Sequence, residues 1–204
     1  GSTQYITWSQ AASSLVNVYY SLNNGTNWTN IETVNPGANS TMTTNWVIAN
    51  NTAVSNQAKV KIEDNANPSV SYSISNASFN VIGVFNITDP ENGNITYANE
   101  YYNITWDKTK TTGISNVILD YRTNDTSSWI NVANASNASQ TVPNLGYYEW
   151  LSVPGSLLTT EAKIRVTDPN NANSTDSGLN YFEIRGRINV ARPNGGENWQ
   201  IYEN

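Results

Sequence analysis

The chain has 204 residues, of which 38% are hydrophobic and only 13% are charged, with a net charge of −6 and a pI of about 4.5. A surface of this sign is a poor partner for nucleic acid, and no apolar run reaches the ~18 residues that a membrane span requires. Histidine and cysteine are absent, which excludes a Ser-His-Asp triad, His or Cys metal ligands and disulfides. The sequence therefore predicts neither an enzyme nor a bound cofactor.

Most of the polar content comes from 34 Asn, 21 Ser and 22 Thr residues. Asn and Ser disfavour helix interiors because their side chains compete for backbone hydrogen bonds, whereas Thr, Val, Ile, Tyr and Trp favour strands. Apolar and polar residues alternate at 16–20 and at 58–62, which is typical of antiparallel strands with one buried face. We expect an all-β chain built from Ig-like or fibronectin-III-like antiparallel sandwiches.

Two copies of one pattern run along the chain. QYITW at 4–8 recurs as YNITW at 102–106, and AKVKIED at 58–64 recurs as AKIRVTD at 162–168. FNVIG at 79–83 likewise recurs as FEIRG 103 positions later. The pattern predicts one sandwich over 1–83, a second over 84–187, and the first strand of a further sandwich over 188–204.

The expected strands follow from alternation and from the turn residues between them. In the first copy they lie near 3–8, 14–21, 27–32, 44–49, 57–63 and 70–82. In the second copy they lie near 84–88, 101–107, 115–122, 128–133, 146–152, 161–168 and 179–186. With no disulfide, the core is expected to rest on six tryptophans, three from each copy: Trp8, Trp28, Trp46, Trp106, Trp129 and Trp150.

The last part of the chain repeats the opening of the second copy. INVARPNGGENW at 188–199 matches FNITDPENGNIT at 85–96, and the first copy shows no opening of this kind. We expect this segment to supply the missing first strand of the next unit. The join is either a strand donated between subunits or a peptide bond within one giant tandem-repeat chain. The residues expected in this inter-unit strand are Ile188, Asn189, Val190, Trp199 and Ile201.

The order P-N-G-G-E-x-W, I-T-W, Y-x-W and A-K-I-R-V-x-D resembles the Ig-like tandem repeats of prokaryotic cell-surface proteins. These repeats are similar to the N-terminal domain of yeast cell-wall glucan-assembly proteins. The resemblance covers both copies and implies an extracellular, non-catalytic sandwich in tandem arrays. The second copy departs from the opening motif with PENG at 90–93, so the glycine pair is not essential to the fold.

Asn-X-Ser/Thr acceptor sites for N-glycosylation are frequent, although this composition makes some of them expected. Asn86 and Asn103 alternate with apolar neighbours, which predicts that both face solvent. A chain dense in such sites indicates the envelope of an archaeon or a bacterium. The twelve sites are at Asn24, Asn27, Asn39, Asn50, Asn76, Asn86, Asn94, Asn103, Asn124, Asn134, Asn137 and Asn173.

Two further chemistries remain open. Pairs of carboxylates in predicted loops, such as Asp89 with Glu91 and Asp168 with Asp176, leave a calcium site open, although ordinary solvated turns are the favoured explanation. Exposed tyrosines leave open a sugar-binding platform.

The leading hypothesis is the structural unit of an extracellular, glycosylated surface filament, with identical units as its partners. The alternative is a stalk module that binds surface glycans.

Overall fold

The computed structural model describes residues 1–11, 15–37, 40–91 and 93–201. Within these ranges the chain forms strands, turns and loops without a helix, which confirms the all-β prediction. The described part accordingly holds no helix of the length and hydropathy that would cross a membrane. The strands fall into two groups that share no pairing among the described residues.

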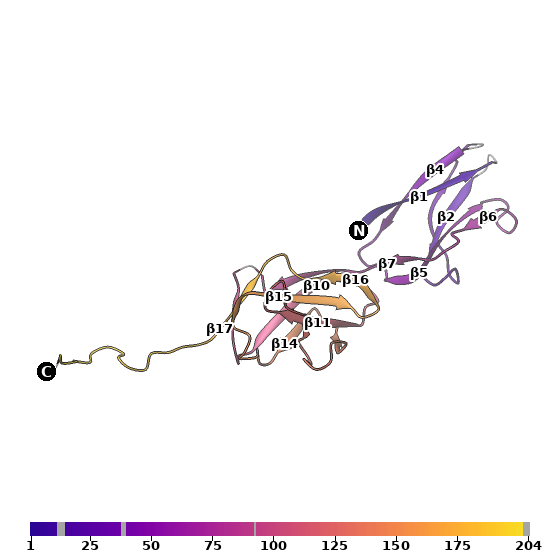
Figure 1. The fold of residues 1–204 in the computed structure, drawn as a ribbon. Helices are drawn as coiled ribbons and strands as arrows, with labels where there is room; N and C mark the ends of the chain where they lie inside the picture. The colour runs from indigo at the N-terminus through magenta and orange to yellow at the C-terminus, as the bar shows by residue number, and fades with distance from the viewer. Residues whose placement is uncertain (12–14, 38–39, 92, 202–204) are drawn as a thin grey trace.

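The first group of strands forms the sandwich on the right of Figure 1. Its two-stranded sheet is β1-β4, and its five-stranded sheet has the order β3-β2-β5-β6, with β7 also pairing with β5. The strands are β1 (Ser2–Gln10), β2 (Val16–Ser21), β3 (Thr29–Val34), β4 (Ser40–Ile48), β5 (Ser55–Asp64), β6 (Tyr72–Ile74) and β7 (Phe79–Val81).

The second group forms a sandwich with a three-stranded sheet, β14-β10-β8, and a seven-stranded sheet of order β12-β11-β15-β17-β9, to which β13 and β16 are attached. Its strands are β8 (Val84–Asp89), β9 (Ile95–Tyr97), β10 (Tyr102–Lys110), β11 (Asn116–Arg122), β12 (Ile130–Asn131), β13 (Thr141–Pro143), β14 (Tyr147–Trp150), β15 (Thr159–Asp168), β16 (Asn171–Asp176) and β17 (Phe182–Arg185).

One pairing in the second sandwich differs from the antiparallel expectation. β9 runs parallel to β17, with Ile184 opposite Thr96. The chain leaves β8 in one sheet, turns at Pro90 and reaches the edge of the other sheet, so it continues beside β17 instead of folding back as a hairpin. The consecutive strands β8 and β9 therefore belong to different sheets.

The two hydrophobic cores differ in extent. The second contains sixteen buried apolar residues, with Trp106 and Trp150 among them. Among the described residues, the first contains a buried cluster of three, Trp46, Ala58 and Val81, with partly buried apolar side chains around it, and Val16 and Val18 are buried outside this cluster. Tyr20 stacks on the Trp46 ring with centroids 4.7 Å apart.

Three of the tryptophans expected in the core are only half-buried. Trp28 and Trp129 are half-buried because they stack under cations on the outer sheet faces: Lys61 Nζ lies 5.1 Å from the Trp28 ring, and Arg165 Cζ lies 4.4 Å from the Trp129 ring. Trp8 is half-buried as well, and its exposure has a different cause. The expectation of a six-tryptophan core is therefore wrong for these three residues.

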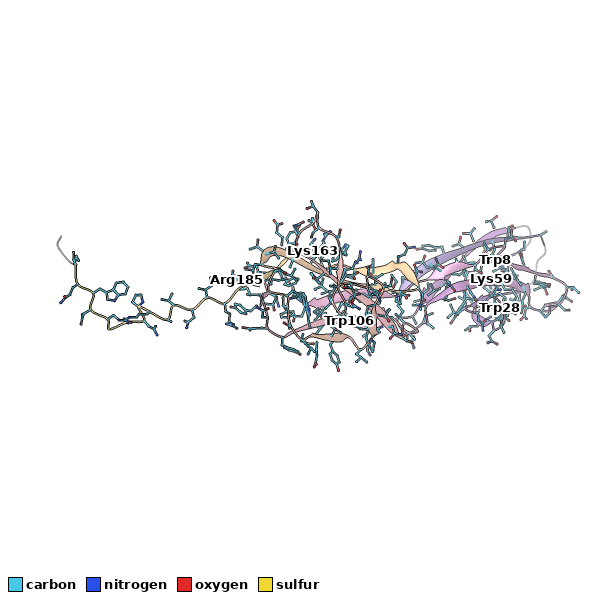
Figure 2. All side chains as sticks on the ribbon, turned by 60° about the horizontal axis from the view of Figure 1, so that its bottom comes forward. Trp8, Trp28, Lys59, Trp106, Lys163 and Arg185 are labelled. Atoms are coloured by element: carbon cyan, nitrogen blue, oxygen red, sulfur yellow. The ribbon has the colours of Figure 1, made fainter. Side chains whose placement is uncertain are left out.

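The junction between the sandwiches is short and packed. Val54 N donates a hydrogen bond to Thr112 O at 2.8 Å, and the Val54 side chain packs against the core of the second sandwich. Beyond Arg185 the chain leaves the second sandwich on the side away from the first, as an extended segment (Figures 1 and 2). The described residues of this segment, 186–201, which we name the tail, contain no strand.

Candidate inter-unit strand site

The site is an open groove along β1 in the first sandwich. β1 pairs with β4 on one side, from Ser2 opposite Ile48 to Gln10 opposite Ser40, and no described strand pairs with its other side. Two cavities of about 680 and 590 Å³ follow this free side. The larger lies between β1 and β6, and the smaller lies between β1 and β7. An unpaired strand edge is a template for another strand.

The second sandwich has a strand of its own at the corresponding place. β8 lies against β10, which matches β1 in sequence, with Ile87 opposite Trp106 and Asn86 opposite Asp107. Phe85 and Ile87 point into the core and are buried, whereas Asn86 between them is exposed. The groove in the first sandwich therefore has the position that β8 fills in the second.

Equivalent core residues show the effect of the open groove. In the second sandwich Trp106 is 3% exposed and Ile104 is fully buried, whereas the matching Trp8 and Ile6 are only half-buried. Trp8 lines the larger cavity and Ile6 lines both cavities. The positions of Trp8 and Trp106 are labelled in Figure 2.

The facing strand of the other sheet behaves in the same way. Ile164 and Val166 of β15 are at most 2% exposed, whereas the matching Val60 and Ile62 of β5 are half-buried and line the groove. Fully burying a large aliphatic side chain contributes about 1.5–3 kcal/mol. A strand in the groove would therefore bury apolar surface on both sheets.

Two polar side chains fasten β8 in the second sandwich. Asp176 Oδ2 accepts a hydrogen bond from Ile87 N at 2.7 Å, and Ser174 Oγ donates one to Gly83 O at 2.8 Å. At an offset of 103 positions, which also relates Phe79 to Phe182, their counterparts are Ser73 and Ser71. Both of these serines line the larger cavity. Each can supply a hydrogen bond to a strand lying in the groove.

A third polar cluster anchors the turn after β8. Asp89 Oδ1 accepts hydrogen bonds from Asn94 Nδ2 at 2.6 Å and from the Tyr102 hydroxyl at 2.8 Å. Burial, together with the hydrogen bond to Asp89, raises the pKa of the Tyr102 hydroxyl. In the tail, Arg192 stands at the position of Asp89 and Glu197 stands at the position of Asn94, so the charges of this pair differ.

All residues expected in the inter-unit strand lie in the tail and are exposed. Ile188 is 94% exposed, Val190 61%, Trp199 69% and Ile201 96%, and Asn189 is exposed too. They make no contact with β1 of their own chain, because the tail leaves the far end of the second sandwich (Figure 1). Four large apolar side chains in sixteen residues are therefore left without a core.

Most of the Asn-X-Ser/Thr motifs that the structure describes lie at the surface. Asn39 lies outside the described residues. Asn94, Asn103 and Asn124 are half-buried. Asn103 departs most from its solvent-facing expectation, because its Oδ1 is buried without a hydrogen-bond partner. Eight sites are exposed: Asn24, Asn27, Asn50, Asn76, Asn86, Asn134, Asn137 and Asn173.

The carboxylates expected in loops form no metal cluster among the described residues. Within the described ranges no three acidic side chains lie close enough to hold a metal ion together. Asp168 Oδ1 instead accepts a hydrogen bond from Asn170 N in its own turn, and Asp176 is bound to β8. Among the tyrosines, Tyr19 lies under Lys61, whose Nζ is 4.7 Å from the ring. Sequence reasoning missed Ser71 and Ser73, whose only signal was their offset from Ser174 and Asp176.

No family model and no curated protein matches this sequence. Among solved structures the chain is similar to the fibronectin(III)-like modules of Clostridium thermocellum CbhA, with 16% identity and a TM-score of 0.33 over 97% of this chain and 92% of that chain. The comparisons give no sequence link to the prokaryotic surface repeats of the expected resemblance, nor to the yeast cell-wall glucan-assembly proteins that are similar to those repeats. The groove along β1 follows from the strand pairing of this chain and not from these comparisons.

Proposed function

We propose that this protein is the structural repeating unit of an extracellular filament, in which the tail of one copy completes the first sandwich of the next. Residues 187–192 of the donating chain lie in the groove of the receiving chain as an additional strand, antiparallel to β1. The observation that carries this proposal is that the groove occupies the place of β8, while the tail carries the sequence of β8.

The register of the added strand follows from the second sandwich. Ile87 lies opposite Trp106 and Asn86 lies opposite Asp107, so Val190 faces Trp8 and Asn189 faces Ser9. Val190 then enters the core as Ile87 does, and Asn189 points to solvent as Asn86 does.

The geometry favours an open chain of units over a closed pair. The groove lies on the first sandwich and the tail leaves the opposite end of the second (Figure 1). A copy that receives a tail therefore still offers its own tail to a third copy. Head-to-tail contacts that do not close produce filaments. The exposed glycosylation sites and the low surface charge suit a position outside the cell, which is part of the proposal.

The experiment compares two neighbouring substitutions in the tail, Val190→Asp and Asn189→Asp. Both add the same charge to an exposed segment, so neither changes the fold of the free chain. A carboxylate at 190 would be buried against Trp8 without a partner, whereas one at 189 remains in water. Sedimentation and negative-stain electron microscopy should show filaments for the wild type and for Asn189→Asp, and none for Val190→Asp.

Filaments of Val190→Asp with the wild-type yield would overturn the proposal, as would a wild-type chain that stays monomeric at every concentration. A denaturing gel of native material distinguishes the two modes of joining. Separate subunits migrate as single units, and one continuous tandem chain migrates at many multiples of the unit mass.

A further inference from the structure

We infer that the tail makes a second, parallel strand contact in which Trp199 of one copy fills the cavity between β1 and β7 of the next. This inference rests on the proposed function, because it concerns the same tail in the same groove. It differs in that the partner strand is β7, the pairing is parallel and one side chain, Trp199, anchors the contact. The added strand along β1 would fill the larger cavity, and Trp199 would fill the smaller one.

The pattern for this contact is the parallel pair of β9 and β17. Glu183 N donates to Asn94 O at 2.9 Å, and Ala98 N donates to Arg185 O at 2.9 Å, so β9 is bonded at both of its ends. Thr96, opposite Ile184 in the middle, is 3% exposed.

The first sandwich offers the same edge without an occupant. β7 matches β17, from Phe79 with Phe182 to Val81 with Ile184, and among the described strands it pairs with β5 alone. The tail segment 198–200 matches 95–97 without a gap. The register then places Asn198 opposite Asn80, and Trp199 opposite Val81.

The side chains that surround this place differ between the sandwiches in a compensating way. In the second sandwich Tyr102 stacks on Phe182 with ring centroids 6.4 Å apart, and the neighbouring strand needs only the small Thr96. In the first sandwich the residue that matches Tyr102 is Gln4, which lines the open cavity of about 590 Å³ with Phe79.

The tail carries Trp199 where the second sandwich has Thr96. A large aromatic residue in the donated strand thus replaces the aromatic ring that the receiving sandwich lacks. Trp199 would meet Trp46 and Phe79, which form an edge-to-face pair with centroids 6.2 Å apart. An exposed tryptophan that enters a preformed apolar pocket is the kind of residue that dominates binding energy at an interface.

The test uses disulfide trapping in the full chain, which has no cysteine of its own. Asn80→Cys with Asn198→Cys probes the parallel contact, and Ser9→Cys with Asn189→Cys probes the strand along β1. All four positions are exposed, so the substitutions leave the core intact. Opposed residues on paired strands have the Cα spacing that a disulfide requires. Asn80→Cys with Gln200→Cys, two residues out of register, is the control.

Under mild oxidation both in-register pairs should give ladders of linked chains on a non-reducing gel, and the control should give few. A ladder from the 9/189 pair without one from the 80/198 pair would overturn this inference and leave the proposed function standing. Failure of the 9/189 pair would overturn the proposed function itself. In a second measurement, Trp199→Ala should raise the rate of filament disassembly on dilution at least about tenfold, while the 9/189 ladder still forms. An unchanged disassembly rate would contradict the anchoring role.

Discussion

Ser174 Oγ donates a hydrogen bond to Gly83 O at 2.8 Å, which ties β16 to the residue that precedes β8. At this point there is no space for a side chain: a Cβ on Gly83 would lie 2.8 Å from Ile114 Cδ1 and 3.2 Å from Lys110 O. Gly186, the matching residue at the start of the tail, has only ordinary contacts, with Leu158 Cδ1 3.7 Å from its Cβ position. The free chain alone therefore gives no reason for a glycine there.

This difference predicts that Gly186→Ala leaves the isolated chain as stable as the wild type and weakens assembly. The added methyl group meets no obstacle in the free tail, but the seated tail would place it where Gly83 is crowded. Thermal unfolding and the critical concentration for filament formation measure the two effects. Asn189→Ala, at a position that points to solvent, is the matched control. If Gly186→Ala assembled at the wild-type critical concentration, the tail would not occupy a seat like that of β8.

Asp176→Ala should destabilise the second sandwich by about 1–3 kcal/mol, because the Ile87 amide loses its acceptor in a partly buried setting. Hydrogen exchange at the Ile87 amide should accelerate in this variant. Ser177→Ala, at the next position, should leave both the stability and the exchange rate unchanged. Equal protection of the Ile87 amide in wild type and variant would show that the carboxylate does not hold β8.

The paired tryptophans predict unequal losses in the unassembled chain. Trp106→Ala should cost about 3–5 kcal/mol, because the ring is 3% exposed and its Nε1 donates to Asn144 Oδ1 at 2.9 Å. Trp8→Ala should cost clearly less, because that ring lies beside the open groove and its Nε1 contact with Thr44 Oγ1 is long, at 3.3 Å. Urea unfolding with hydrogen exchange to resolve the two sandwiches provides the comparison. Equal losses would mean that the groove is closed in the free chain.

Glycan occupancy should follow exposure. Native material should carry sugar on several exposed sites, with Asn86 among them, and none on Asn103, whose Oδ1 is buried within the sheet. Intact-mass measurement followed by peptide mapping tests both statements. A unit mass of 22.4 kDa, the value of the bare sequence, would contradict glycosylation. Sugar on Asn103 would contradict its placement.

Strand alternation predicts much of this fold, because burial on one face leaves a period of two in the sequence. It predicts that Ile104 and Trp106 point to the core, and both do. It failed for Trp28 and Trp129, whose rings could equally be covered by a core or by cations on the outer face, and only the register of β5 and β15 decides between these. β16 was missed because NANSTD contains no apolar alternation.

The candidate site was predictable in its sequence match and not in its geometry. The match of 188–199 to 85–96 identifies a segment with the sequence of β8 that has no pairing strand among the described residues of its own sandwich. The local sequence pattern does not predict the difference in burial between β5 and β15, because burial depends on how strands distant in the sequence pack. Val60 and Ile62 are half-buried, whereas the matching Ile164 and Val166 are buried.

The most direct test of the central claim is a cryo-electron microscopy map of the assembled filament. The account predicts a strand of residues 187–192 from a neighbouring unit beside β1 and antiparallel to it, with Val190 opposite Trp8 and Asn189 facing solvent. Density in which the free side of β1 stays bare, or in which the tail binds elsewhere, would contradict it.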